Sequence, residues 1–145
     1  MMNTNKIKIV ENSPNAEDYL HLRESLSWCT YSLEDTRIAL SNNLYCVSVY
    51  YEYEIIGMGR IVGDGRLCFY IQDIMVKPAY QNQGIGTMIL NHIVRYLKNT
   101  ATKEAYIGLM SKKGKEGFYE NFGFIKRPND IMGNGMVIPH FEPKK

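Results

Sequence analysis

The chain has 145 residues, a length that suits one domain burying roughly two thirds of its unfolded surface. Its net charge is +2, from 17 basic and 15 acidic residues. Because no basic run alternates with aromatic side chains, we expect no nucleic-acid partner. No apolar run approaches the ~18 residues of a membrane-spanning helix, so we expect no membrane partner. We predict a single domain over residues 1–145.

Cysteine and histidine usage points to a cytoplasmic protein without a metal. Cys29, Cys46 and Cys68 form no C-x-x-C pair and leave one thiol unmatched, which predicts reduced, mostly buried thiols. The three histidines are scattered along the chain and form no H-E-x-x-H motif, so no metal site is expected.

The first part of the chain predicts one strand followed by two helices. Residues 6–10 alternate polar and apolar side chains, as a strand does. Ser13 before Pro14 predicts an N-cap with proline at the first position of a helix running to about residue 27. Ser32 with Asp35 three residues later predicts a capped second helix through about residue 42.

A meander of three strands is predicted next, over residues 44–51, 55–62 and 66–76. Gly57 and Gly59 in the middle strand suggest a bend or a close approach of another backbone. Gly63-Asp64-Gly65 predicts the tight turn between the second and third strands.

The remaining residues predict two helices and three strands. The helices cover residues 84–98 and 117–121, the second with Gly123 as its C-terminal cap. The strands cover residues 105–110, 124–126 and 136–138. The residues alone therefore predict one domain of the α/β or α+β class.

The chain is organised around the stretch from the end of the third meander strand to the helix of residues 84–98. A polar, glycine-bearing turn, residues 81–86, joins that strand to the amphipathic helix. The first amides of a helix lack internal partners, and its dipole makes that end partly positive. Glycines leave these amides bare, so the pattern predicts a site for a phosphate.

Two common phosphate motifs do not fit this turn. The dinucleotide fingerprint G-x-G-x-x-G fails because Ile89 stands where its third glycine belongs, and no P-loop motif is present. The pattern Val76-x-Pro78-x-x-Gln81-x-x-Gly84-x-Gly86 instead resembles the acyl-CoA-binding motif of the GNAT family, the GCN5-related N-acetyltransferases.

The resemblance implies a fold and a cofactor. The fold is a mixed, mostly antiparallel sheet of six to seven strands with helices on both faces, in the order β-α-α-β-β-β-α-β-α-β-β. Acetyl-CoA is the implied acyl donor, with no metal. Strand backbone would hold the pantetheine arm and loop amides the pyrophosphate, while the Gln81 side chain would shape the loop entrance or lie in solvent. The implied cofactor-binding residues are Ile74, Met75, Val76, Gln81, Asn82, Gln83, Gly84, Ile85, Gly86, Thr87 and Tyr119.

Residues 118–124 resemble the F-Y-x-x-x-G-F block of the same family, and Tyr119 matches its tyrosine. In many members of that family this residue protonates the departing thiolate. A phenol with a pKa near ~10 is protonated at neutral pH and can donate to a thiolate. The alternative is that Tyr119 only packs in the core, like the phenylalanines around it.

Asp73, just ahead of the loop, is the candidate to serve the acceptor amine, as a base acting through water or as a partner of the ammonium. The alternative is a carboxylate at the surface or the sheet edge. Where some family members carry a glutamate, this chain has Tyr70, so the base does not carry over directly. Three further residues are candidates to border the acceptor site: Tyr31, Glu34 and Arg60.

The predicted function is acetyl-CoA-dependent N-acetyl transfer to a primary amine of a small molecule. Gln72-Asp73 before the loop and the late Gly135-Met136 resemble small-amine members, including the arylalkylamine group of plants. Two alternatives stay open: acetylation of a lysine or N-terminus of a protein or peptide, and a catalytically silent CoA-binding domain. A homodimer is a possible assembly.

Overall fold

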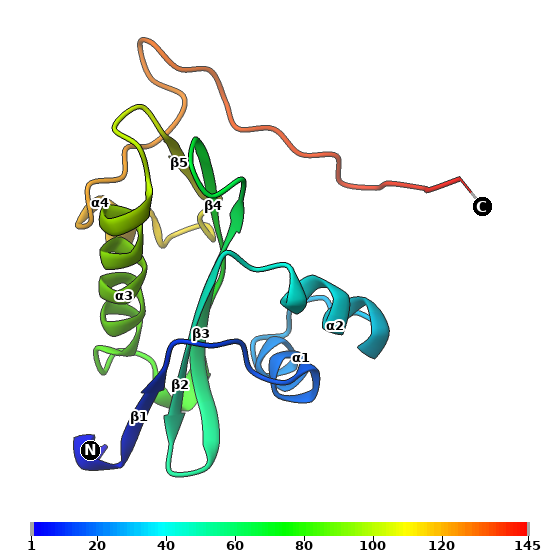
Figure 1. Ribbon diagram of the computed structural model, residues 1–145, viewed down its shortest axis with the longest axis vertical. Helices are drawn as coiled ribbons and strands as arrows, with labels where there is room; N and C mark the ends of the chain where they lie inside the picture. The colour runs from blue at the N-terminus through cyan, green and yellow to red at the C-terminus, as the bar shows by residue number, and fades with distance from the viewer. Residues whose placement is uncertain (1, 145) are drawn as a thin grey trace. The chain divides into compact units, whose positions relative to one another are not determined.

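The structure is a computed structural model that describes residues 2–144. The chain divides into two compact units, Met1–Leu109 and Met110–Lys145, and each is described by itself. Figure 1 shows their elements in chain order. The single domain over residues 1–145 stays a prediction.

The first unit is built on one mixed sheet in the order β1-β2-β3-β4-β5. Its strands are β1 (Ile7–Val10), β2 (Tyr45–Tyr51), β3 (Glu54–Gly63), β4 (Cys68–Val76) and β5 (Tyr106–Gly108). The first four strands pair antiparallel with their neighbours, and β5 pairs parallel to β4. This confirms the predicted mixed, mostly antiparallel sheet.

The predicted count of six to seven strands is wrong for residues 2–144, where the sheet has five. Residues 124–126 and 136–138, predicted as strands, form none. A strand needs a partner backbone for its hydrogen bonds, and in the second unit neither segment pairs. The side chains of Met136, Val137 and Ile138 are exposed.

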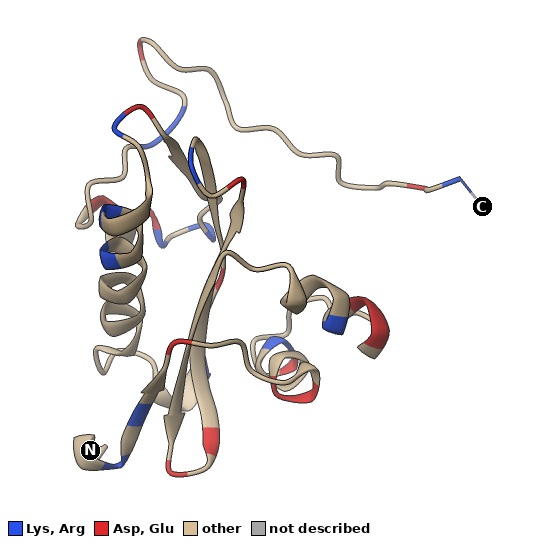
Figure 2. Cartoon of the chain, viewed as in Figure 1, with Lys and Arg blue, Asp and Glu red and all other residues tan. Residues whose placement is uncertain are grey.

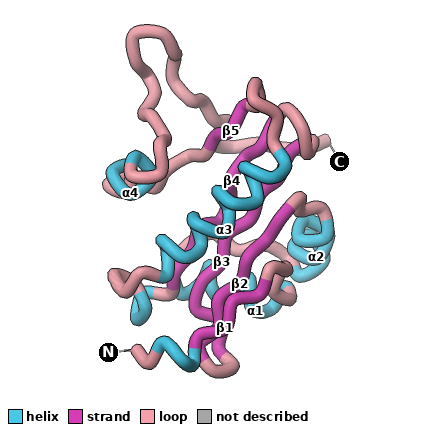
Figure 3. Tube along the Cα trace, turned by 60° about the vertical axis from the view of Figure 1, so that its left-hand side comes forward, coloured by secondary structure: helices cyan, strands magenta, loops and turns pink. Residues whose placement is uncertain are grey.

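Helices lie on both faces of the sheet, as predicted. Figures 1 and 3 show α3 (Ile85–Thr100) along one face and α1 (Ala16–Ser25) and α2 (Leu33–Ser41) on the other. Two short 3₁₀ turns, Thr4–Lys6 and Pro78–Tyr80, precede β1 and α3. In the second unit, α4 spans Glu116–Glu120. None of the helices in residues 2–144 has the length and apolar character needed to cross a bilayer.

One of the two predicted helix N-caps is confirmed. The Ser32 hydroxyl accepts the Asp35 amide at the start of α2. For α1 the predicted cap, Ser13, is wrong: Asn15 accepts the Asp18 amide at 2.7 Å. The Ser13 hydroxyl donates instead to the Leu40 carbonyl at 3.3 Å and thus holds the end of α2. Acidic residues gather in the first turns of both helices (Figure 2), where the helix dipole favours them.

The two faces of the sheet pack differently. On the α1 face, a cluster of large side chains forms the core: Tyr19, Leu22, Leu40, Cys46, Ile55, Met58 and Met75. On the α3 face, Gly57 and Gly59 leave room for the helix. A Cβ on Gly59 would stand 2.6 Å from Ile74 Cδ1 and 2.7 Å from Ile89 Cγ2. The predicted close approach at these glycines is therefore a close approach of α3 to the sheet.

β4 carries a bulge where it pairs with β3. The pairs on either side are Met58 with Met75 and Arg60 with Gln72. One residue of β3, Gly59, therefore faces two of β4, Asp73 and Ile74. Asp73 has a φ of 55°, in the left-handed region. Such bulges bend a strand and re-aim its side chains, and this one turns Asp73 toward α1.

The turn into β4 is stapled by Asp64. Its Oδ1 accepts the amides of Arg66, Leu67 and Cys68 at 2.8, 2.7 and 3.0 Å. The amides of Arg66 and Leu67 bind the carboxylate instead of a neighbouring strand, and β4 begins at Cys68, two residues later than the predicted start.

Candidate functional site

The loop before α3 presents a helix N-terminus without a side-chain cap. Gly84 is the N-cap, with a φ of 87°, and no side chain bonds to the first amides. Helical pairing begins with the Met88 amide, which donates to the Gly84 carbonyl at 3.1 Å. The amides of residues 85–87 therefore lack partners inside the helix. A Cβ built on Gly84 meets nothing within 4 Å, so the loop is open at Gly84, and unpartnered amides at a helix N-terminus favour a phosphate group.

Side chains of the loop brace its own backbone. The Gln81 side-chain amide donates to the Val76 carbonyl at 3.0 Å, and that of Gln83 donates to the Ala79 carbonyl at 3.3 Å. Asn82 takes a left-handed φ of 62°. Gln81 therefore ties the loop to the end of β4, which supports the loop-shaping role over a solvated side chain.

The predicted pantetheine-binding residues form the last part of β4, beginning with Ile74 in the bulge. Met75 is buried in the core on the α1 face. The Ile74 side chain lies over Gly59 on the opposite face. Contact of this backbone with the pantetheine arm stays a prediction.

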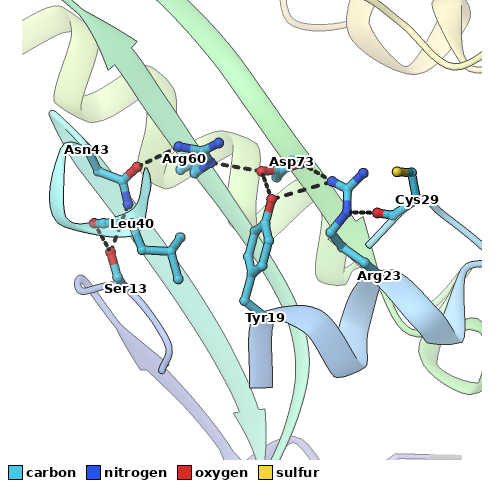
Figure 4. Close-up of polar contacts among 8 residues, drawn as sticks. All are labelled: Ser13, Tyr19, Arg23, Cys29, Leu40, Asn43, Arg60 and Asp73. Atoms are coloured by element: carbon cyan, nitrogen blue, oxygen red, sulfur yellow. Dashed lines mark hydrogen bonds and ion pairs between the residues drawn. The ribbon is translucent and has the colours of Figure 1, made fainter. Parts of the chain in front are cut away.

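Asp73 lies at the centre of a buried polar group, here called the Asp73 cluster: Tyr19, Arg23, Arg60 and Asp73 (Figure 4). The Tyr19 hydroxyl donates to Asp73 Oδ2 at 2.6 Å, and Arg60 Nε donates to the same oxygen at 2.8 Å. Arg23 Nη1 donates to Oδ1 at 2.8 Å. The Asp73 side chain is only 2% exposed. Three of its roughly four acceptor positions are thus filled.

Arg23 joins the cluster to the loop that follows α1. Its Nε donates to the Cys29 carbonyl. Its guanidinium carbon lies 4.9 Å from the centre of the Tyr31 ring and 5.4 Å from that of Trp28, within the range of cation–π attraction. One side chain therefore connects α1, the bulge of β4 and the loop 26–32.

Sequence reasoning named some of these residues and missed others. Arg60 and Tyr31, proposed as neighbours of the acceptor, both lie at the cluster, whereas Glu34 is exposed in the first turn of α2. Tyr19 and Arg23 were missed as functional candidates. They stand four residues apart, on one helix face, and both are buried. An arginine on a buried face needs a buried anion, which is the signal that links Arg23 to Asp73.

Tyr119 lies in α4 of the second unit. Its ring packs edge-on against Phe118 and Phe124, with centroids 5.1 and 6.1 Å apart. Burial raises the pKa of the Tyr119 phenol above its usual value, so the hydroxyl stays protonated at neutral pH. These facts are compatible with both the acid role and the packing role.

The cysteines are free, but the prediction that they are mostly buried is wrong. Only Cys46 is buried, whereas Cys29 and Cys68 are exposed. Cys29 sits in the loop held by Arg23, and Cys68 opens β4, so both lie at element ends rather than in the core. In residues 2–144 no three histidine, cysteine or acidic side chains are grouped so that they could bind a metal ion.

Comparison with known proteins places these features in a family. The sequence model of the acetyltransferase (GNAT) family matches residues 11–124. The structure is similar to that of a probable acetyltransferase from methicillin-resistant Staphylococcus aureus, with 34% identity and a TM-score of 0.84, covering 92% of this chain and 99% of that one.

Two curated relatives carry acetyltransferase names. An uncharacterized N-acetyltransferase, ycf52, from Gracilaria tenuistipitata var. liui is 29% identical over 127 residues, 82% of this chain and 66% of its own length. The histone acetyltransferase TAP1 from Glycine max is 27% identical over 127 residues, 80% of this chain. The chain thus spans just under two thirds of the first relative and 54% of the second. On the family match over residues 11–124 and the likeness to the S. aureus structure, the chain belongs to the GNAT family of acetyltransferases.

Proposed function

We propose that this protein transfers the acetyl group of acetyl-CoA to the primary amine of a small molecule. The observation that carries the proposal is the uncapped N-terminus of α3, opened by Gly84 at the end of the loop that follows the bulged strand β4, in a chain of the GNAT family.

The loop of residues 81–87 is the proposed pyrophosphate site. Bare amides and the positive end of the α3 dipole favour an anion there. Strand residues 74–76 would pair with the pantetheine arm, because among the described residues β5 pairs only with residues 68–70 of β4 and leaves that edge of residues 74–76 open. Acetyl-CoA supplies the thioester.

The reaction is a direct transfer. The neutral amine nitrogen bonds to the thioester carbonyl carbon, the carbon–sulfur bond breaks, and the proton that the nitrogen loses passes to water. We assign protonation of the leaving thiolate to Tyr119, whose phenol is protonated at neutral pH.

For Asp73 the contacts support a different role from the predicted base. Its carboxylate is buried and already accepts three hydrogen bonds, so it is poorly placed to take a proton from an amine. We assign it a positioning role: it ties α1 and β3 to the bulge.

A peptide acceptor is the second candidate, because the relative from Glycine max is named a histone acetyltransferase. Free-thiol release from acetyl-CoA, measured with a panel of small amines and lysine peptides, separates the candidates. We expect turnover with small amines. Turnover with peptides alone would select the second candidate, and acetyl-CoA binding without turnover would leave a silent CoA-binding domain.

A further inference from the structure

The Asp73 cluster contains an unmatched positive charge. Arg23 and Arg60 each bind a different oxygen of Asp73, and their side chains are only 9% and 12% exposed. Two guanidinium charges thus face one carboxylate charge, which leaves one positive charge over. A buried charge is costly without a partner of opposite sign.

The other contacts of the cluster are neutral. Arg60 Nη1 donates to the Asn43 side-chain oxygen at 3.0 Å, and Arg23 Nε donates to a backbone carbonyl. Burial and the bond to Asp73 raise the pKa of Tyr19, so its phenol stays uncharged. Within residues 2–144, Asp73 is the one carboxylate in ion-pair distance of either arginine.

Each arginine keeps a terminal nitrogen for a further bond. The described contacts use Nε and Nη1 of Arg23 and Arg60 and leave Nη2 of both. Every buried side-chain nitrogen and oxygen in residues 2–144 has a partner, so both Nη2 atoms reach the surface. In Figure 4 the Nη2 atom of Arg23 points away from Asp73. The neighbouring Tyr31 is 51% exposed, which opens this side of the cluster to solvent.

The cluster lies beside the strand that the proposed function gives to the acyl donor. Asp73 directly precedes Ile74, and neighbouring Cα atoms are about 3.8 Å apart. A small acceptor can therefore contact the cluster with one end while its amine reaches the backbone of β4.

We propose that the acceptor amine carries an anionic group, a carboxylate or a phosphate, which the unmatched charge attracts and Arg23 Nη2 binds. This inference rests on the proposed acetyl transfer. Guanidinium N–H groups form charge-assisted hydrogen bonds with either anion, and Nη2 of Arg23 carries two such donors. The same charge disfavours the protonated form of an amine bound nearby, which helps transfer without a carboxylate base.

Paired acceptors test the proposal in the thiol-release assay. One pair is an α-amino acid and its carboxamide, and the other is aminoethyl phosphate and ethanolamine, so the two pairs separate carboxylate from phosphate. In at least one pair we expect kcat/KM to favour the anionic member roughly 10- to 100-fold, and added salt to reduce the difference. Equal kcat/KM within both pairs would overturn this proposal and leave acetyl transfer standing. If none of the amines gave thiol release, the proposed function would be refuted instead.

Binding can be followed without turnover because the chain has a single tryptophan, Trp28, whose ring lies 5.4 Å from the Arg23 guanidinium carbon. With CoA saturating, so that phosphate cannot occupy the α3 loop, the four compounds are titrated against Trp28 fluorescence. We expect a saturable change with an anionic compound and none with its neutral partner. The same response to both members of each pair would contradict an anion site.

Variants separate binding from positioning. Arg23→Gln should raise KM for the anionic acceptor and abolish the preference, Arg23→Lys should restore part of it, and Arg60→Gln should weaken it. Arg37→Gln is the matched control, since Arg37 is exposed on α2 and pairs only with Glu17 among the described residues. Circular dichroism and acetyl-CoA affinity check the fold. If Arg23 were only structural, kcat/KM would fall equally for the charged and neutral members.

Discussion

At the scale of single residues, the roles of Asp73 and Tyr119 depend on what surrounds them. The sequence placed a carboxylate ahead of the CoA loop, but its partners come from positions up to 54 residues away. A pattern over a few neighbouring residues does not predict contacts between residues so far apart in the sequence. Burial and three donors make Asp73 an anchor for two arginines rather than a free base.

Asp73→Asn separates the two roles. A base contributes about 10²–10⁴-fold to the rate, so its loss would lower kcat by that factor for every acceptor. If Asp73 is an anchor, its replacement by asparagine removes a negative charge from the cluster. The preference for anionic acceptors should then persist or grow. Steady-state kinetics with the paired amines measure both effects. Asparagine also tolerates the left-handed φ at this position.

Tyr119→Phe tests the proton donor. The change keeps the ring against Phe118 and Phe124 and removes only the hydroxyl. If the phenol protonates the thiolate as charge develops, kcat should fall ~10-fold or more with little change in KM for acetyl-CoA. Because burial raises the pKa of this phenol, the wild-type kcat should decline only above the usual tyrosine range near ~10, and this decline should vanish in the variant. Wild-type kcat with the same pH profile would leave Tyr119 a packing residue.

At the scale of elements, the sequence predicted well those features that depend on neighbouring residues. The meander, the capped start of α2 and the loop–helix joint before α3 follow from turn residues and periodicity over a few positions. The bulge of β4 was not predicted, because it follows from how β3 and β4 pair. Nor does any short pattern tell whether residues 136–138 find a partner strand.

Gly59→Ala tests the close approach of α3 to the bulge. The new Cβ would stand 2.6–2.9 Å from methyl groups of Ile74, Ile89 and Ile93. Overpacking of this kind costs ~1–3 kcal/mol, so the free energy of unfolding in urea should fall by about that amount. Lys8→Ala, an exposed change on β1, should stay within ~0.5 kcal/mol of wild type. An unchanged urea midpoint of unfolding for Gly59→Ala would mean that α3 does not pack closely against β3 at this residue.

Asp64→Ala tests the staple that begins β4. Hydrogen bonds from the amides of Arg66, Leu67 and Cys68 lower the pKa of the Asp64 carboxyl. Its contribution to stability is therefore present above the unfolded-state pKa near ~3.9 and lost as pH falls through the lower folded-state value. We expect a lower Tm at neutral pH and a smaller loss of stability on acidification than in wild type. Thermal unfolding at pH 7 and in acid measures both, and parallel curves for the two proteins would argue against the staple.

At the scale of the whole molecule, the family and the catalysed class of reaction were within reach of the sequence, because the acyl-CoA motif is short and contiguous. The match to the GNAT family over residues 11–124 confirms that recognition. The acceptor was not within reach, because the residues that bear on it come from α1, β3 and β4. The cytoplasmic location and the homodimer stay predictions.

The binding of acetyl-CoA to the N-terminus of α3 is tested most directly by titration calorimetry with wild type and Gly86→Glu. Glutamate in the first turn of a helix is compatible with its dipole, so the variant should fold, while its side chain and charge occupy the proposed phosphate position. Asn91→Glu, the same added charge at an exposed position of α3, is the control. We predict that wild type and Asn91→Glu bind acetyl-CoA with similar affinity and that Gly86→Glu gives no binding heat. Unchanged affinity in a folded Gly86→Glu protein would contradict a CoA site at this helix end.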